Sequence, residues 1–180
     1  MIKIPKVKDK IYHSTADYFT DIDLRKGKKY KDFGNGFYLS YYKEHAERKA
    51  RIMANLKNKS NKYVYIYPTI QDEFAKLYKM RKAKVFEVPN LEWADFILES
   101  RTRNHIWHDY DVVIGPTADD DTRVILDTYR EGGYGAVGSF EARDTLIRLL
   151  HPEKLATQVF IATDAGLNIL DIRNREVIKL

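Results

Sequence analysis

The sequence predicts an α+β fold, and three observations support this class. Short runs rich in Val, Ile and Tyr, which favour strands, recur along the 180 residues. Stretches with apolar residues at helical spacing fall between these runs without strict alternation, so a repeating βαβ architecture is not expected. Hydrophobic residues make up 44% of the chain and charged residues 32%, which is typical of a globular protein. We therefore expect one domain over residues 1–180.

The segments expected to form strands share β-branched or aromatic residues, and several stop at a proline, which cannot donate a ladder hydrogen bond. In chain order they are residues 11–14, 37–41, 62–67, 84–88, 112–116, 159–162 and 176–180. The polar segment 15–32, interrupted by Gly27, is expected to be mostly loop.

The segments expected to form helices carry apolar residues at helical spacing, and the first of them also lacks Gly and Pro. They are residues 43–57, 71–80, 91–99 and 140–150, with a further amphipathic stretch around 124–126 and a short helical turn or hairpin at 164–170. In the first of them, the predicted buried face consists of Ala46, Ala50, Met53 and Leu56.

Charge and cysteine content exclude several classes of function. Lys and Arg number 31 against 26 Asp and Glu, a formal net charge of +5 that mildly favours a polyanionic partner. The chain has no cysteine, which rules out disulfides, thiol catalysis and Cys-ligated metals and fits a reducing compartment. No apolar run is long enough to span a membrane, so we expect a cytoplasmic protein without a membrane partner. His105, His108 and His151 lack metal-ligand spacing, and no metal is expected.

A glycine cluster at residues 32–40, Asp-Phe-Gly-Asn-Gly-Phe-Tyr-Leu-Ser, is the most distinctive motif. Two glycines one residue apart let the backbone turn sharply and approach a ligand. A dinucleotide fingerprint would need a preceding apolar strand, a third glycine and a following helix, and here a strand follows instead. Taken alone, the cluster predicts a glycine turn before a strand.

Together with Tyr12-His13-Ser14 upstream, this cluster resembles the ADP-ribosyltransferase superfamily, in the branch of diphtheria toxin and the poly(ADP-ribose) polymerases. In that branch the first strand bears a His-Gly pair, and a Phe-Gly-Lys-Gly-Ile-Tyr-Phe segment supplies a tyrosine that stacks on nicotinamide. The sequence is most similar to a small bacterial family of this superfamily. The further matching segments are Lys43-Glu44-His45-Ala46, residues 93–96 and 109–120, and Thr157-Gln158-Val159-Phe160, so the resemblance spans residues 12 to about 163.

The resemblance implies a split β-sandwich of two small, mainly antiparallel sheets flanked by helices. It implies NAD as a substrate, and an ADP-ribosyltransferase that releases nicotinamide and modifies a macromolecular acceptor, protein or nucleic acid. His13 would hold the ribose, Tyr38 would stack on nicotinamide and Gln158 would contact the ribose 2′-hydroxyl. The residues expected around the nucleotide are Ser14, Thr15, Phe33, Gly34, Asn35 and Gly36.

Two departures from the family pattern shape this prediction. Gln158 stands where the superfamily has a glutamate, and an amide can donate and accept hydrogen bonds but cannot act as a base. This change favours transfer of a single ADP-ribose over chain elongation. Asp119 or Asp120 is a candidate acid on the acceptor side, although carboxylates there equally suit the start of a helix. The second stacking tyrosine has no match, and His45 and Lys49 lie near its place.

Two alternatives to a transferase stay open. The fold could be retained without the chemistry, giving a module that binds a nucleotide, a nucleic acid or a protein, and Gln158 is the feature in its favour. The protein could also be the toxin of a toxin–antitoxin pair, with an inhibitory partner protein. Lysine-rich stretches with interleaved tyrosines admit a nucleic-acid surface, but charged runs are more often solvated faces.

Overall fold

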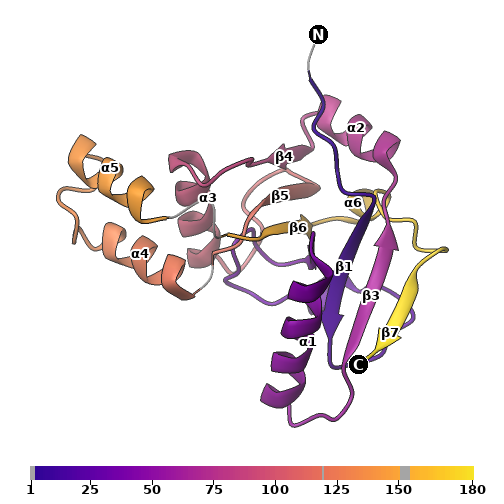
Figure 1. Ribbon diagram of the computed structural model, residues 1–180. Coiled ribbons are helices and arrows are strands. Elements are labelled where there is room, and N and C mark those ends of the chain that lie inside the picture. Colours follow the sequence, from indigo (N-terminus) through magenta and orange to yellow (C-terminus); the bar gives the residue numbers. More distant parts are fainter. Residues whose placement is uncertain (1–2, 119, 151–154) are drawn as a thin grey trace.

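The computed structural model describes residues 3–118, 120–150 and 155–180, and it confirms the α+β class (Figure 1). These residues form one seven-stranded sheet of order β4-β5-β6-β2-β1-β3-β7, with six α-helices around it. The strands are β1 (Lys10–Thr15), β2 (Phe37–Ser40), β3 (Tyr63–Pro68), β4 (Ala83–Val85), β5 (Val112–Pro116), β6 (Thr157–Ile161) and β7 (Glu176–Lys179). The helices are α1 (Lys43–Leu56), α2 (Gln71–Lys79), α3 (Leu91–Thr102), α4 (Asp120–Arg130), α5 (Phe140–Leu149) and α6 (Asp164–Leu167), with a 3-10 turn at Leu24–Lys26.

The junction between β1 and β2 divides this sheet into two halves. Every neighbouring pair of strands is antiparallel except β4 and β5. β1 pairs with β3 along its whole length, from Lys10 to Thr15, whereas it pairs with β2 only at Tyr12 and Ser40. Where two separate small sheets were expected, the described residues thus form one sheet whose halves are joined by a single register pair.

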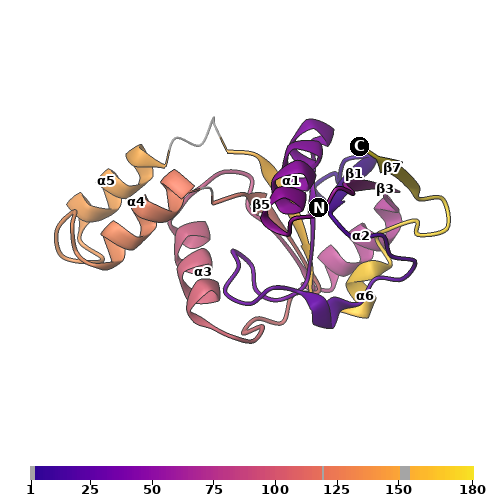
Figure 2. The same ribbon diagram turned by 90° about the horizontal axis from the view of Figure 1, so that it is seen from below.

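The two faces of the sheet carry different cores because side chains alternate along each strand. On one face, buried residues of the strands, such as Phe37 and Tyr65, pack with Phe74 and Leu77 of α2. The opposite face is covered in two places. α1 lies over β1 and β3, and α3 lies over β5 and β6, with α4 and α5 packed beside α3. In Figure 2, β1 and β3 separate α1 from α2 and α6.

Small side chains let α1 approach its strands closely. Ala46, Ala50 and Ala54 are buried, and the first two pack against Val64 and Ile66 of β3. The prediction that Leu56 belongs to the buried face is wrong, since this residue is 82% exposed. The buried residues are spaced four apart, at Ala46, Ala50 and Ala54, and Leu56 does not lie in this row.

The second cluster on that face extends into a helical pair. α4 and α5 lie beside each other at one end of the molecule, next to α3 (Figure 1). Leu126 of α4 and Ala142 and Leu146 of α5 are buried with Trp93 and Ile97 of α3. In the described part of the chain, no helix is both long and apolar enough to cross a membrane.

Candidate functional site

Asp32 is the centre of a buried polar network. Its Oδ1 accepts hydrogen bonds from Nε (3.1 Å) and Nη2 (2.7 Å) of Arg101 in α3. Its Oδ2 accepts from the backbone N–H of Ala118 (3.0 Å) and from Nε2 of Gln158 (2.8 Å). Four donors therefore compensate a carboxylate that is only 8% exposed. Asp32 ties the turn before β2 to α3, to the segment after β5 and to β6, a role that the sequence did not reveal.

Gln158 is held by this network through one end of its amide. The residue is buried, and besides Asp32 its Nε2 contacts the carbonyl oxygen of Pro116 at 3.4 Å. Both partners are acceptors, so position 158 needs a donor, which a glutamate carboxylate cannot provide. With Nε2 engaged, Oε1 is the end of the amide left to accept a hydrogen bond. The glutamine thus supplies the hydrogen-bond donor that Asp32 requires, and its role is more than the absence of the glutamate charge.

Tyr38 lies on the same face as Gln158, on the neighbouring strand. In the register Ser40 opposes Gln158 and Tyr38 opposes Phe160, whose ring centroid lies 5.0 Å from that of Tyr38. The Tyr38 hydroxyl donates to the carbonyl of Gly34 (2.8 Å) and accepts from the N–H of Phe33 (3.0 Å). Burial, and then the charge of Asp32, raise the pKa of Tyr38 well above its ordinary value. The neutral phenol therefore holds the glycine turn in place through its hydrogen bonds to the backbone of Phe33 and Gly34.

The glycines of this turn are required by close backbone packing. A Cβ at Gly36 would lie 2.6 Å from the ring of Phe160 and even closer to the carbonyl oxygen of Ile161 in β6. A Cβ at Gly27 would lie 2.8 Å from the carbonyl oxygen of Gly36, so the two ends of segment 27–36 touch. Gly34 has φ +109°, a conformation that favours glycine.

Asn35, between the two glycines, is anchored at one end only. Its Nδ2 donates to the carbonyl of Asn104 (2.9 Å), while its Oδ1 is buried without a hydrogen-bond partner among the described residues. Buried acceptors are normally satisfied, so this amide oxygen is available to a donor from outside the chain.

His13 lies where β1 and β2 diverge. Its Nδ1–H donates to the carbonyl oxygen of Tyr38 (2.8 Å), and its ring stacks on Phe37 at 4.2 Å between centroids. Burial lowers the pKa of His13 from 6.5 to about 4, against the opposing effect of the Tyr38 carbonyl, so the imidazole is neutral at pH 7. By strand alternation, this imidazole lies on the opposite face from the side chains of Tyr38 and Gln158.

The remaining residues expected on β1 lie beside it. Ser14 and Thr15 are both buried, and Ser14 lies on the face of Tyr38. The Oγ1 of Thr15 accepts from the N–H of Asp17 (3.0 Å) and so begins the segment that leads away from the strand. Phe33 is fully buried among the aromatic residues under α3.

One comparison with known proteins places this chain. The model of a family described as protein of unknown function (DUF3990) matches residues 10–172. The chain belongs to this family. No curated protein and no solved structure matches it. The residues matched by the DUF3990 model include Asp32, Arg101 and Gln158 of the polar network.

Two of the predicted acidic residues of this DUF3990 protein cannot be placed at the site. Asp119 lies outside the described residues, and Asp120 begins α4 with a side chain that is not described. His151 also lies outside them. His108 donates from Nε2 to the carbonyl of Phe33 (2.9 Å), and burial lowers its pKa. Within the described ranges, no three His or acidic side chains are grouped so as to hold a metal ion.

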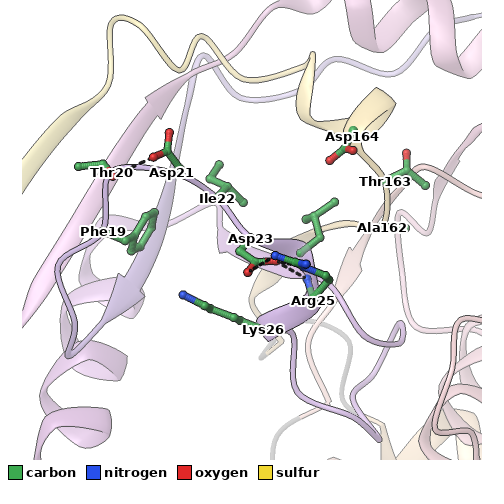
Figure 3. A pocket seen from close by; sticks show the side chains of 11 residues that line it. Phe19, Thr20, Asp21, Ile22, Asp23, Arg25, Lys26, Ala162, Thr163 and Asp164 are labelled. Carbon is green, nitrogen blue, oxygen red and sulfur yellow. Dashed lines mark hydrogen bonds and ion pairs between the residues drawn. The ribbon is translucent and has the colours of Figure 1, made fainter.

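A surface pocket of about 840 Å³ lies beside the site on the other face of the sheet. Figure 3 shows its walls, residues 19–26 and 162–164, with Lys26 and the paired Asp23 and Arg25 between Phe19 and Asp164. Phe19 contacts the ring of His13 edge-on at 5.6 Å. Acidic and basic side chains are mixed in the walls, and none of the predicted nucleotide-binding residues lines the pocket.

Proposed function

We propose that this DUF3990 protein is an NAD-dependent ADP-ribosyltransferase that moves a single ADP-ribose onto a macromolecule and releases nicotinamide. The observation that carries the proposal is that two of the three predicted residues, Tyr38 and Gln158, come from distant parts of the sequence and share one face of the sheet. His13 lies on the opposite face, so it supports the strand of Tyr38 and the ribose-holding role expected of it is not proposed. Tyr38 and Gln158 lie on one face of adjacent strands, diagonal neighbours at roughly 7–8 Å, and His13 binds the Tyr38 carbonyl. The single pair between β1 and β2 also fits the split sheet that the resemblance implies.

The chemistry assigned to these residues follows from their polar atoms. The Tyr38 ring supplies an aromatic surface for the cationic nicotinamide, an attraction of about 1–2 kcal/mol. Oε1 of Gln158 accepts a hydrogen bond from the ribose 2′-hydroxyl, while Asp32 accepts from Nε2 and so orients the amide.

In the transfer step, the bond between C1′ and the pyridinium nitrogen breaks and its electron pair leaves with neutral nicotinamide. The resulting oxocarbenium-like centre takes a lone pair from the acceptor, whose proton passes to water. Gln158 removes no proton in this scheme, because an amide is not a base. The protein's contribution is the orientation of the Gln158 amide, whose Nε2 is held by Asp32.

A second candidate is a nucleotide-binding module without turnover. The observation in its favour is that the Asp32 carboxylate is already bonded to Arg101, Ala118 and Gln158, which leaves the described part of the site without a free carboxylate. Such a module would bind NAD and leave it intact.

Release of nicotinamide from NAD decides between the two. We expect release by the wild-type protein in the presence of a cell extract as acceptor source, and a loss on the order of 10-fold or more in Tyr38→Ala, since stacking and anchoring of the turn are both removed. Tyr18→Ala, at an exposed tyrosine, is the matched control. Full activity in both Tyr38→Ala and His13→Ala would reject the transferase, and calorimetric binding of NAD without release would select the module. Circular dichroism establishes that each variant is folded.

A further inference from the structure

The side-chain amide of Gln158 is fixed in one of its two possible orientations. Its Nε2 lies 2.8 Å from Oδ2 of Asp32 and 3.4 Å from the carbonyl oxygen of Pro116. Both partners are acceptors, so turning the amide over would set Oε1 against a carboxylate oxygen and a carbonyl oxygen. The nitrogen of the amide therefore faces the network, and the oxygen is the end left for a ligand.

The two acceptors that hold Nε2 are themselves held in place. Arg101 donates from Nε (3.1 Å) and Nη2 (2.7 Å) to Oδ1 of Asp32, and the N–H of Ala118 donates to Oδ2 (3.0 Å). Nη2 of Arg101 also donates to the Ala118 carbonyl (3.1 Å), and the Pro116 carbonyl accepts from Nε1 of the buried Trp93 (3.1 Å). The side chains of Asp32 and Arg101 are only 12% and 19% exposed, so little solvent competes for these bonds. Rotation of the Asp32 carboxylate would break several of them at once.

The oxygen of the Gln158 amide keeps contact with solvent. Among the described residues, the buried side-chain polar atoms without a hydrogen bond are Asn35 Oδ1, the Tyr67 hydroxyl and Arg101 Nη1. Oε1 of Gln158 has no hydrogen bond from these residues either, yet it is not one of the buried atoms, so it forms part of the 7% of Gln158 that is exposed. Tyr38 lies on the same face of the adjacent strand. The accepting atom is thus presented beside the ring that we propose to stack on nicotinamide.

We infer that Asp32 and Arg101 are positioning residues that keep the oxygen of the Gln158 amide toward the ligand, so that the site selects a ribose whose 2′-hydroxyl donates a hydrogen bond. This inference rests on the proposed function. A hydroxyl can donate to Oε1, a 2′-hydrogen cannot, and a 2′-fluorine is an acceptor that would face another acceptor. A site built to bond one polar group leaves that group unpaired when the wrong ligand binds. The expected order of affinity is therefore NAD, then its 2′-deoxy analogue, then its 2′-fluoro analogue.

Calorimetric titration without an acceptor tests this order, with NAD and with analogues that carry hydrogen or fluorine at the 2′ position of the nicotinamide ribose. We expect the wild type to bind NAD about tenfold more tightly than the 2′-deoxy analogue, the loss of one hydrogen bond, and the 2′-fluoro analogue more weakly still. In Asp32→Asn the new carbonyl oxygen stays with the charged Arg101 and the new N–H₂ group faces Gln158, so the Gln158 amide turns over and offers Nε2 to the ligand. The 2′-fluoro analogue should then bind better than the 2′-deoxy analogue. A general loss of structure would weaken all three ligands and would not reverse this order.

Three further variants accompany Asp32→Asn. Asp23→Asn is the matched control, since it neutralises another aspartate that pairs with an arginine, Arg25, on the other face of the sheet, and it should keep the wild-type order. Arg101→Lys retains the charge but not the two bonds to one oxygen of Asp32, so the preference for NAD should shrink without a reversal. Gln158→Met removes the amide and should bind NAD and both analogues with equal affinity. The last two variants keep the test decisive if circular dichroism shows that Asp32→Asn does not fold.

Release of nicotinamide by the same proteins separates the two proposals. The wild-type order of affinities in folded Asp32→Asn, or in Gln158→Met, together with release of nicotinamide by the wild type, would overturn the positioning role and leave the transferase standing. The expected order and its reversal without any release would support the positioning role and reject the transferase. Equal affinity of the wild type for NAD and both analogues, or no binding of NAD, would overturn the selection of the 2′-hydroxyl.

Discussion

At the scale of single residues, the pairing of Asp32 with Gln158 determines what position 158 tolerates. The amide donates to a carboxylate and to a backbone carbonyl, so an acceptor at this place has no partner. The substitution that would bring the sequence closer to the superfamily pattern is therefore one that this network opposes.

Gln158→Glu should destabilise the fold at pH 7 by about 2–4 kcal/mol, since it sets a second carboxylate against Asp32. Repulsion raises the pKa of the acidic pair in the folded state, so the penalty is present above the raised pKa and is relieved as the pH falls through it. Urea unfolding at pH 7 and pH 5 measures this change. Gln158→Met, which adds no charge, should lose stability about equally at both pH values. An equal loss at both pH values in Gln158→Glu would show that the two carboxylates do not interact.

Tyr38→Phe separates the ring from the hydroxyl. The variant loses two hydrogen bonds to the glycine turn and should be less stable by about 1–2 kcal/mol. It keeps the aromatic face, so release of nicotinamide should persist in Tyr38→Phe and fall in Tyr38→Ala. Chemical denaturation and the nicotinamide assay on the same preparations measure both effects. A release rate as low in Tyr38→Phe as in Tyr38→Ala would assign the effect to the turn rather than to stacking.

At the scale of elements, local sequence signals were sufficient for most helices and strands. The strand at Val112–Pro116 is observed as predicted, because an apolar run ending in proline has few alternatives. α3 continues to Thr102, beyond the predicted end at residue 99, because no Gly or Pro stops it. The ion pair of Asp32 with Arg101 could not be predicted from the sequence, because it joins residues 69 positions apart and depends on how α3 packs. The order of the strands was likewise set by packing rather than by any local pattern.

The turn before β2 should tolerate no side chain at its second glycine. Gly36→Ala forces a methyl group into the carbonyl of Ile161, and we expect a loss of about 3 kcal/mol or more, as for severe overpacking. Gly138→Ala is the control, because it meets no atom within 4 Å and carries only the strain of φ +86°, about 1–2 kcal/mol. Thermal unfolding of both variants compares them, and similar losses would mean that β2 and β6 shift apart easily.

At the scale of the whole molecule, the neutral His13 makes stability depend on pH. Its folded pKa of about 4 lies below the ordinary value of 6.5, so the unfolded chain binds this proton first as the pH falls. The contribution of His13 is complete above pH 6.5 and is lost between pH 6.5 and about 4. Between pH 7 and pH 4.5 the wild type should lose about 2–3 kcal/mol more than His13→Gln, which keeps a donor for Tyr38 but does not titrate. Equal losses in urea unfolding would show that the imidazole is protonated in the folded state.

The narrow link between the sheet's halves has a consequence for how the molecule opens. Among the described residues, one register pair and the hydrogen bond from His13 to the Tyr38 carbonyl join the backbones of β1 and β2, although the core around Phe37 and Tyr65 packs across the junction. The backbone pairing can therefore open there while the ladders of β1 with β3 and of β2 with β6 stay intact. Local opening follows the weakest boundary, so amide deuteration along this seam should precede exchange within either half. The junction where the sheet opens most easily thus lies next to Tyr38.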